Sequence, residues 1–300
     1  MMKQLLFVYN PTAGRQRAKA ILSDVLTVFA QEGYQITVRP TLDRGDATQV
    51  VSHIAAGYDR VVCCGGDGTL NEVVRGLLTL PREQRPILGY VPAGTTNDFS
   101  RNINLPRSTQ QLAKVACSGV PRAIDVGQMA ERHFLYIAAF GLFTDVPYST
   151  PQTSKNLLGH LAYLLEGAGR LMNFPSYHVH VTTDQGLDIE GDFIYGMVSN
   201  TVSIGGLVNL PRDLVCLDDG QFEALLIRNP KTPKDWQSIL TALTTQKLPE
   251  DGSVVGFTCS KAHFISPEPL AWTVDGEYGG AYTDLEITNC SRVITIACGN

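Results

Sequence analysis

Three glycines, an aspartate and a threonine stand directly behind a short apolar run. Residues 61–71 read VVCCGGDGTLN, so Asp67 lies between Gly66 and Gly68. Glycines let a ligand approach the backbone, and a helix start leaves backbone N–H groups that favour negative charge. Asp67 is well placed to hold a magnesium ion bound to phosphates. A tight turn whose aspartate caps the next helix is the alternative, and the motif alone does not decide.

Two further segments carry similar chemistry. NPTAG at Asn10–Gly14 is another glycine-bearing turn behind an apolar run, and PAGTTNDFSR at Pro92–Arg101 is rich in hydroxyl and amide groups. If the three preceding runs are parallel strands of one sheet, all three turns lie at the same edge. Ligands of open α/β sheets bind in crevices outside the carboxyl ends of the strands. The combination therefore favours a phosphate site over three unrelated turns.

The first half of the chain alternates strand and helix patterns. We expect strands at Leu5–Tyr9, Gln35–Arg39, Arg60–Cys64 and Ile87–Val91, and helices over residues 18–29, 46–56, 69–78, 97–103 and 109–117. Such alternation predicts βαβ units and an α/β domain with a mostly parallel sheet.

The second half changes in character from about residue 125. Strand patterns dominate, at Tyr177–Thr183, Asp188–Ser199, Phe222–Arg228, Val254–Ser260, Ala271–Asp275 and Arg292–Cys298. Two helical stretches interrupt them, near Lys155–Phe174 and Pro233–Gln246. We predict a nucleotide-binding domain at residues 1–128 and a β-sandwich domain at residues 129–300. Whether the extreme C-terminus packs back on the first domain is left open.

Composition excludes several classes of protein. The chain has 300 residues, 44% of them hydrophobic, and a formal net charge of −5, which argues against a general nucleic-acid binder. Seven cysteines without paired spacings argue against a disulfide framework. No run reaches the roughly 18 apolar residues of a membrane span, and the N-terminus is not a signal sequence. We therefore expect a cytoplasmic protein.

Taken together, these motifs resemble a known family. NPTAG, GGDGTLNEV and PAGTTNDFSR, in this order, resemble the diacylglycerol kinase catalytic domain family, and most closely its bacterial soluble lipid kinases, relatives of the sphingosine and ceramide kinases. The likeness continues through IDVG (Ile124–Gly127), Gly205–Leu207, LDDGQFEALLI (Leu217–Ile227) and VDGEYGG (Val274–Gly280). GGDGT alone is shared with NAD kinases; the GTTNDF segment and the DGE turn single out lipid kinases.

The resemblance implies a two-domain fold of the NAD kinase and diacylglycerol kinase type, with ATP in the cleft between the domains. It implies ATP contacts at Asn10, Pro11, Thr12, Ala13, Gly14, Thr41, Gly66, Asp67, Gly68, Thr69, Leu70, Asn71, Glu72 and Thr95. It also implies a structural Mg²⁺ site at Asp219, with ligands from Cys216 and Gln221. Asp-Gly between two strands is equally a plain hairpin signal, and Thr41 has the alternative of an ordinary loop residue.

The reaction needs a base. Phosphoryl transfer to an alcohol depends on positioning and electrostatics while a carboxylate accepts the hydroxyl proton. The resemblance puts that base in the DGE turn, at Glu277. Asp275 either orients the site or is the base itself.

We therefore interpret the chain as an ATP- and Mg²⁺-dependent lipid kinase and favour diacylglycerol as acceptor, with phosphatidic acid as product. A sphingoid or ceramide kinase, an NAD kinase and a non-catalytic nucleotide- or lipid-binding regulator are the alternatives. A membrane lipid as substrate requires transient contact with the bilayer, through Lys155–Phe174 as an interfacial helix or through a basic patch at Arg15, Arg17, Lys19 and Arg101. Core packing is the other interpretation of that helix. A homodimer is left open.

Overall fold

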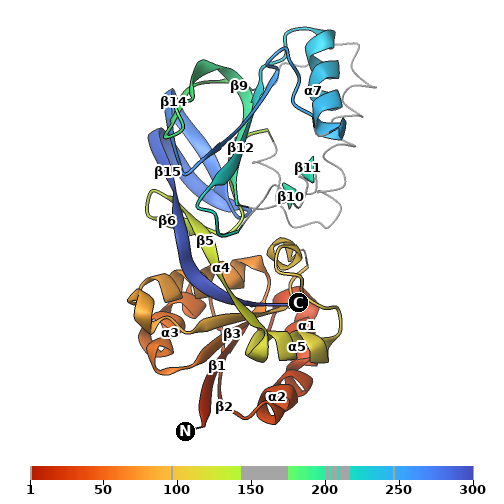
Figure 1. Cartoon of the computed structure of the whole chain (residues 1–300), viewed down its shortest axis with the longest axis vertical. Helices are drawn as coiled ribbons and strands as arrows, with labels where there is room; N and C mark the ends of the chain where they lie inside the picture. Colours follow the sequence, from red (N-terminus) through yellow and green to blue (C-terminus); the bar gives the residue numbers. More distant parts are fainter. Residues whose placement is uncertain are drawn as a thin grey trace. The chain divides into compact units, whose positions relative to one another are not determined.

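The computed structural model describes residues 2–95, 97–142, 175–200, 203–204, 208–209, 217–245 and 247–299. The chain divides into two compact units (Figure 1): Met1–Val126 together with Ser291–Asn300, and Gly127–Cys290. The sequence-based boundary after residue 128 lies close to this division, and the C-terminal segment belongs to the first unit. The expected helix at Lys155–Phe174 lies outside the described residues, as do Gly205–Leu207.

Parallel strands form the centre of the first unit. Their spatial order is β4 (Ile87–Pro92), β3 (Arg60–Gly65), β1 (Lys3–Tyr9) and β2 (Tyr34–Pro40). Ile296, near the end of β15 (Glu277–Cys298), pairs in parallel with Leu88 of β4. Since these strands run in one direction, their carboxyl ends share one edge of the sheet.

Helices alternate with these strands along the chain. They are α1 (Ala13–Ala20), α2 (Leu22–Gln31), α3 (Asp46–Ile54), η1 (Ala55–Gly57), α4 (Asp67–Leu78), η2 (Arg82–Gln84), η3 (Asp98–Arg101) and α5 (Thr109–Ser118). One face of the sheet is covered by α1, α2 and α5, because Ala18, Phe29 and Ala116 share a buried cluster with Phe7 and Val62 of the strands.

Two helices stand where one was expected over residues 18–29. The junction is Ile21, whose backbone (φ −93°, ψ −2°) departs from regular helix geometry. Hydrogen bonds from Ile21 N to Arg17 O (3.1 Å) and from Val25 N to Ile21 O (3.0 Å) continue across it. The chain therefore kinks without leaving the helical path, and the apolar stripe still faces the sheet.

Antiparallel strands build the second unit. They are β5 (Val120–Met129), β6 (Arg132–Phe134), β7 (Ile137–Gly141), β8 (Tyr177–Thr183), β9 (Asp188–Ser199), β12 (Phe222–Arg228), β13 (Val254–Cys259), β14 (Lys261–Val274) and the first part of β15, with a short pair β10 (Ser203–Ile204) and β11 (Val208–Asn209). Both β7 and β8 pair with β9 and with β14, so these four strands form a ring of pairings. The finer expectation of two stacked sheets stays a prediction.

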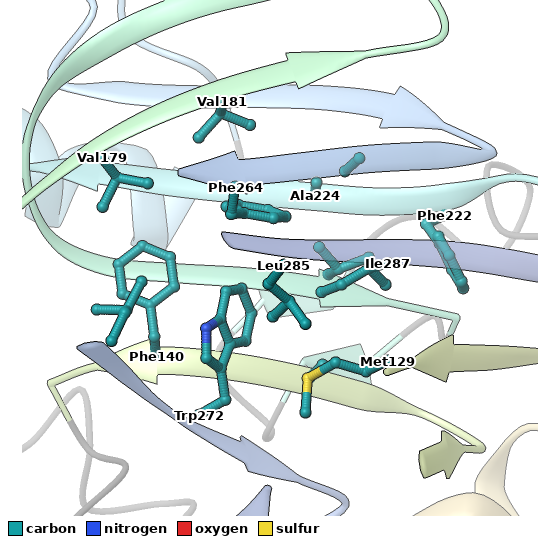
Figure 2. Close-up of a cluster of buried hydrophobic side chains, with 14 of the residues drawn as sticks. Met129, Phe140, Val179, Val181, Phe222, Ala224, Phe264, Trp272, Leu285 and Ile287 are labelled. Atoms are coloured by element: carbon teal, nitrogen blue, oxygen red, sulfur yellow. The ribbon is translucent and has the colours of Figure 1, made fainter. Parts of the chain in front are cut away.

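An aromatic core lies inside this curved sheet (Figure 2). The Trp272 ring meets Phe140 and Phe264 edge to face, each at 5.0 Å between ring centroids. Such aromatic pairs contribute about 0.5–1.5 kcal/mol each beyond the burial of their area. On β12, Phe222 and Leu226 face this core.

Helix α7 (Pro233–Thr245) covers the other side of the same strands. Its Ile239 and Leu243 share a second buried cluster with Ile194, Met197 and Ile227. The strands of this region are therefore apolar on both faces, which explains why their sequences read as continuous hydrophobic runs.

Candidate functional site

Backbone hydrogen bonds tie the predicted turns of the first unit together. Asn10 N, at the end of β1, donates to Cys64 O of β3 (2.9 Å). Ala93 N, at the end of β4, donates to Gly65 O (2.8 Å). Thr41 N, just beyond β2, donates to Tyr9 O (2.9 Å). Four successive βα turns therefore meet at the carboxyl edge of the sheet.

The turn after β1 is organised by Asn10. Its Oδ1 accepts hydrogen bonds from Thr12 N (2.9 Å) and Thr12 Oγ1 (2.8 Å), which is an Asx turn. Its Nδ2 donates to Thr69 Oγ1 (3.3 Å), which links it to the glycine turn of β3. Gly14 has φ +56°, and a Cβ there would overlap the carbonyl oxygen of Ala93. Only glycine fits this contact.

The glycine turn after β3 starts helix α4. Gly66 is the N-cap in extended conformation, and Asp67 is the first helical residue. The Asp67 side chain is partly exposed, and its Oδ1 accepts from Phe99 N (3.3 Å). A carboxylate in the first turn is also favoured by the helix dipole. Asp67 thus ties two turns together at the place where the backbone N–H groups of a helix start favour an anion.

The turns after β3 and β4 approach each other through glycine. A Cβ on Gly94 would lie 2.5 Å from Gly66 Cα and 2.8 Å from Asn97 Oδ1. Asn97, at φ +51°, holds the β4 turn by accepting from Gly94 N (2.9 Å) and donating to Gly94 O (2.8 Å). The resemblance assigned no role to Asn97. The sequence marked Asn97 only as part of the GTTNDF segment and as a residue type that tolerates left-handed backbone.

The other predicted nucleotide contacts differ in what they offer a ligand. Thr95 and Gly68 are exposed, while Pro11, Ala13 and Asn71 are partly exposed. Leu70 is fully buried, and its N–H donates to Gly66 O (3.0 Å) within the helix, so neither its side chain nor its N–H faces outward.

Glu72 is engaged by protein backbone. Its two carboxylate oxygens accept from Gly45 N (2.8 Å) and Ala47 N (3.3 Å) at the start of α3. Thr48 Oγ1 donates to the Glu72 carbonyl oxygen (2.9 Å). The position predicted to contact ATP therefore also fixes the loop that follows Thr41.

Two neutral thiols lie behind the glycine turn. Cys63 and Cys64 are fully buried, as the apolar run predicts. Burial raises the pKa of Cys63 well above its usual value, and burial raises the pKa of Cys64 to about 12 against the opposing charge of Arg17. Both act as small apolar packing groups.

In the second unit the DGE turn separates the roles of its two carboxylates. Asp275 and Gly276 have φ +47° and +83°, the left-handed pair of a tight hairpin between β14 and β15. The Asp275 carboxylate accepts from three consecutive backbone N–H groups, those of Leu135 (2.8 Å), Tyr136 (3.1 Å) and Ile137 (3.1 Å). Asp275 therefore anchors the turn, whereas Glu277 is exposed.

The predicted metal site lies on the turn before β12. Asp219 is exposed, its Oδ1 accepts from Gln221 N (2.9 Å), and Gly220 has φ +76°. Asn289 Nδ2 donates to Gln221 O (3.2 Å). The third predicted ligand, Cys216, lies outside the described residues. Within the described part of the chain, no group of three or more His, Cys, Asp or Glu is arranged to hold a metal ion.

Nevertheless, the Asp219 carboxylate and the Gln221 carbonyl oxygen are donors of the kinds that suit a hard cation. Glu223 Oε2 and Asn289 Oδ1 are buried and have no hydrogen-bond partner among the described residues. Burial, with a further contribution from the charge of Asp219, raises the pKa of Glu223 to about 8. Carboxylate, carbonyl and amide oxygens are the ligands that Mg²⁺ and Ca²⁺ take in proteins. The residues present therefore fit the implied ion.

Two histidines of β8 contact carboxylates of β9. On the outer face of the sheet, His178 contacts Asp192 (2.9 Å) and Glu190 (3.0 Å), and His180 contacts Asp188 (2.8 Å). The hydrogen bond to Asp192, and then that to Glu190, raise the pKa of His178. These are exposed contacts between imidazole and carboxylate groups on the surface of the sheet.

A buried carboxylate was not singled out from the sequence. Asp125, within the IDVG segment, is fully buried and accepts from Arg292 N (2.8 Å). It connects the end of β5 in the first unit to the returning C-terminal segment. Among the described residues, no helix has the length and apolar character needed to cross a bilayer.

Comparison with known proteins agrees with these motifs. The family model of the diacylglycerol kinase catalytic domain matches residues 4–129. A diacylglycerol kinase of Bacillus subtilis (strain 168) is 35% identical over 281 residues, which cover 93% of this chain and 91% of that protein. A diacylglycerol kinase of Staphylococcus epidermidis is 32% identical over 93% of this chain and 87% of its own.

Solved structures share the fold. A diacylglycerol kinase from Bacillus anthracis str. Sterne superposes with a TM-score of 0.75 at 23% identity, over 99% of this chain and 97% of that one. Yeast NADH kinase, crystallised with NADH, superposes with a TM-score of 0.54 at 10% identity, over 98% of this chain and 82% of that one. The two-domain architecture is thus common to both groups of kinases, and the extended sequence likeness places the chain in the diacylglycerol kinase family.

Proposed function

We propose that this kinase transfers the γ-phosphoryl group of ATP to the hydroxyl group of diacylglycerol, with phosphatidic acid and ADP as products. The observation that carries the proposal is the convergence of the glycine turns at the carboxyl edge of the parallel sheet. Membership in a family whose relatives are named diacylglycerol kinases supports the choice of acceptor.

The turns supply what phosphate binding requires. Gly14 lies against Ala93 and Gly94 against Gly66, so these backbones present no side chain at their closest approach. The start of α4 at Asp67 offers N–H groups and the positive end of a helix dipole. We assign phosphate binding to these turns and magnesium bound to ATP to Asp67. That magnesium would neutralise charge on the phosphates.

Glu277 is the proposed base. The lipid oxygen forms a bond to the γ-phosphorus, the bond from that phosphorus to the ADP oxygen breaks, and the hydroxyl proton passes to the Glu277 carboxylate. Asp275 is a positioning residue in this scheme because three backbone N–H groups already occupy its oxygens. Glu277 is the exposed carboxylate of the same turn.

The acceptor lies in a membrane, so we further propose transient contact with a bilayer surface. The basic residues Arg15, Arg17 and Lys19 are exposed on α1, beside the turn after β1. Cations gathered there would attract an anionic surface or the phosphates of the nucleotide.

A transfer assay tests the proposal. Radiolabelled ATP is offered with diacylglycerol, ceramide, sphingosine or NAD, and the products are separated by thin-layer chromatography. Label is expected in phosphatidic acid. Label in another product would identify a different acceptor. No label in any product would indicate a non-catalytic regulator instead of a kinase.

The variant Glu277→Gln tests the base in the same assay. It keeps the shape and removes the basicity, so the rate should fall about 10²–10⁴-fold with little change in ATP affinity. A rate within a few-fold of the unchanged protein would show that the base is elsewhere. Glu268→Gln, an exposed glutamate on β14 of the same unit, is the matched control.

A further inference from the structure

An apolar side chain is exposed in the loop that follows β2. Leu42 is 82% exposed, the largest exposed fraction among the large apolar side chains that the structure describes. A single exposed leucine is common on protein surfaces and has no meaning by itself. What this leucine contributes therefore depends on how firmly its loop is held and on where the loop lies.

Hydrogen bonds hold the backbone of this loop. Thr41 N donates to Tyr9 O (2.9 Å), and Leu42 N donates to Asp46 Oδ2 (2.9 Å). The Glu72 carboxylate accepts from a backbone N–H group at the far end of the loop (2.8 Å). A backbone fixed at three points cannot fold the leucine inward without breaking these hydrogen bonds. Leu42 is therefore held at the surface, where a ligand or a partner can cover it.

The loop lies beside the turns to which we assign the phosphates. Tyr9, whose carbonyl oxygen accepts from Thr41 N, is followed by the Asn10 turn, and Asn10 N donates to Cys64 O near the end of β3. Neighbouring strands lie about 4.8 Å apart, so the end of β2 is about 10 Å from the glycine turn after β3. A nucleoside attached to phosphates at that turn extends far enough to meet the loop.

Other open α/β sheets use the corresponding position for a nucleoside. In sheets that bind dinucleotides, the phosphates lie at the first glycine turn, and a carboxylate about 20 residues further along the chain binds the ribose hydroxyl groups. Here Asp43 directly follows Leu42 and is exposed. The loop thus offers an apolar surface that suits the flat face of a base and a carboxylate that suits hydroxyl donors.

We propose that Leu42 packs against the base of ATP and that Asp43 accepts hydrogen bonds from the ribose hydroxyl groups. The inference rests on the proposed function, and it adds two residues to which the family resemblance gave no role. The glycine turns would then hold the phosphates, and the loop after β2 would distinguish a nucleoside triphosphate from a triphosphate without a nucleoside.

Isothermal titration calorimetry of the full-length protein in MgCl₂ tests the loop separately from catalysis. ATP is compared with inorganic tripolyphosphate, which has the phosphates and no nucleoside. It is also compared with dideoxy-ATP, which lacks both ribose hydroxyl groups. The unchanged protein should bind ATP more tightly than either of the other two ligands.

Leu42→Ala should weaken ATP binding about three- to tenfold, because an apolar contact with the base is lost, and should leave tripolyphosphate binding unchanged. Asp43→Asn should remove most of the preference for ATP over dideoxy-ATP. The matched controls are Leu248→Ala, an exposed leucine of the second unit, and Asp24→Asn, an exposed aspartate on α2. Both controls should bind all three ligands as the unchanged protein does.

Unchanged ATP affinity in Leu42→Ala would overturn the contact with the base, and so would an equal loss of affinity for ATP and tripolyphosphate. An undiminished preference for ATP over dideoxy-ATP in Asp43→Asn would overturn the contact with the ribose. If Leu42→Ala binds ATP normally but binds less to vesicles of diacylglycerol and anionic phospholipid, the leucine contacts the bilayer instead. These results leave the proposed function standing while the unchanged protein labels phosphatidic acid, whereas an unchanged protein that binds no ATP would refute both.

Discussion

Glu72 provides the most direct test of how this fold positions the turns proposed to bind phosphate. The side chain projects from α4, yet both of its carboxylate oxygens accept from the first N–H groups of α3, those of Gly45 and Ala47. The N-cap of α3 is Gly45 itself, which has no side chain to offer. Glu72 therefore caps a helix that lies 25 to 27 residues earlier in the chain.

The magnitude follows from the two hydrogen bonds. Loss of a helix cap costs about 0.5–2 kcal/mol, and a hydrogen bond to a charged group contributes about 1.5–3 kcal/mol. Since Glu72 is partly exposed, hydrogen bonds to water replace part of this stabilisation when the side chain is removed. We expect Glu72→Ala to lower the free energy of unfolding by about 2 kcal/mol, which corresponds to about 3 °C in Tm for a chain of 300 residues. Glu72→Gln keeps one acceptor and should cost about half as much.

Calorimetry and nucleotide titration measure the two candidate roles separately. Thermal unfolding of Glu72→Ala and Glu72→Gln is compared with that of Glu83→Ala, an exposed glutamate of η2 whose loss should stay within about 0.5 kcal/mol. ATP binding is measured in parallel. An unchanged Tm in Glu72→Ala, together with tenfold weaker ATP binding, would refute the capping role and support the direct contact that the family resemblance implies.

Three further outcomes can be measured. Asp67→Ala should abolish turnover at saturating magnesium with a folded, cooperative melt, and near-normal turnover would contradict its assignment. Gly94→Ala should weaken ATP binding at least tenfold, because its Cβ would push Gly66 away; equal binding would show that the turns can separate. Because the folded-state pKa of His178 is raised, its pair with Asp192 stabilises below the unfolded pKa and is lost as pH rises through the folded pKa. NMR titration of His178 in Asp192→Asn should show a lower pKa, and no change would refute the pairing.

The sequence predicted the strands and helices of the first unit well, because each element is marked by its own pattern of apolar residues. Apolar runs of strand length alternate with helical periodicity, and the strands β1, β3 and β4 stand where those runs do. The sequence shows Gly14 and Gly94 as turn residues. Glycine is required at both positions, however, because each backbone lies against that of another turn. Such contacts join residues far apart in sequence, and no local pattern contains them.

The second unit shows what sequence patterns miss. A strand was expected only at Ala271–Asp275, whereas β14 extends over Lys261–Val274. Pro267 and Pro269 interrupt the pattern, and the structure accommodates them where the register with β15 shifts between Ile265 and Leu270. Proline cannot donate to a ladder hydrogen bond and is tolerated in strands at such irregularities. The sequence therefore reads as a loop where the fold has a bulged strand.

The DGE turn shows how one short motif can combine a structural role with the proposed catalytic one. Besides the catalytic interpretation, an Asp-Gly pair between two strands predicts a plain hairpin, and the structure contains that hairpin, with φ positive at Asp275 and Gly276. The two interpretations are compatible because the two carboxylates have different surroundings. Asp275 turns inward to three N–H groups and fixes the backbone, and this holds the exposed Glu277 at a defined place two residues later. A proton acceptor needs such rigidity, since misplacement by about 1 Å can cost roughly 10²-fold in rate.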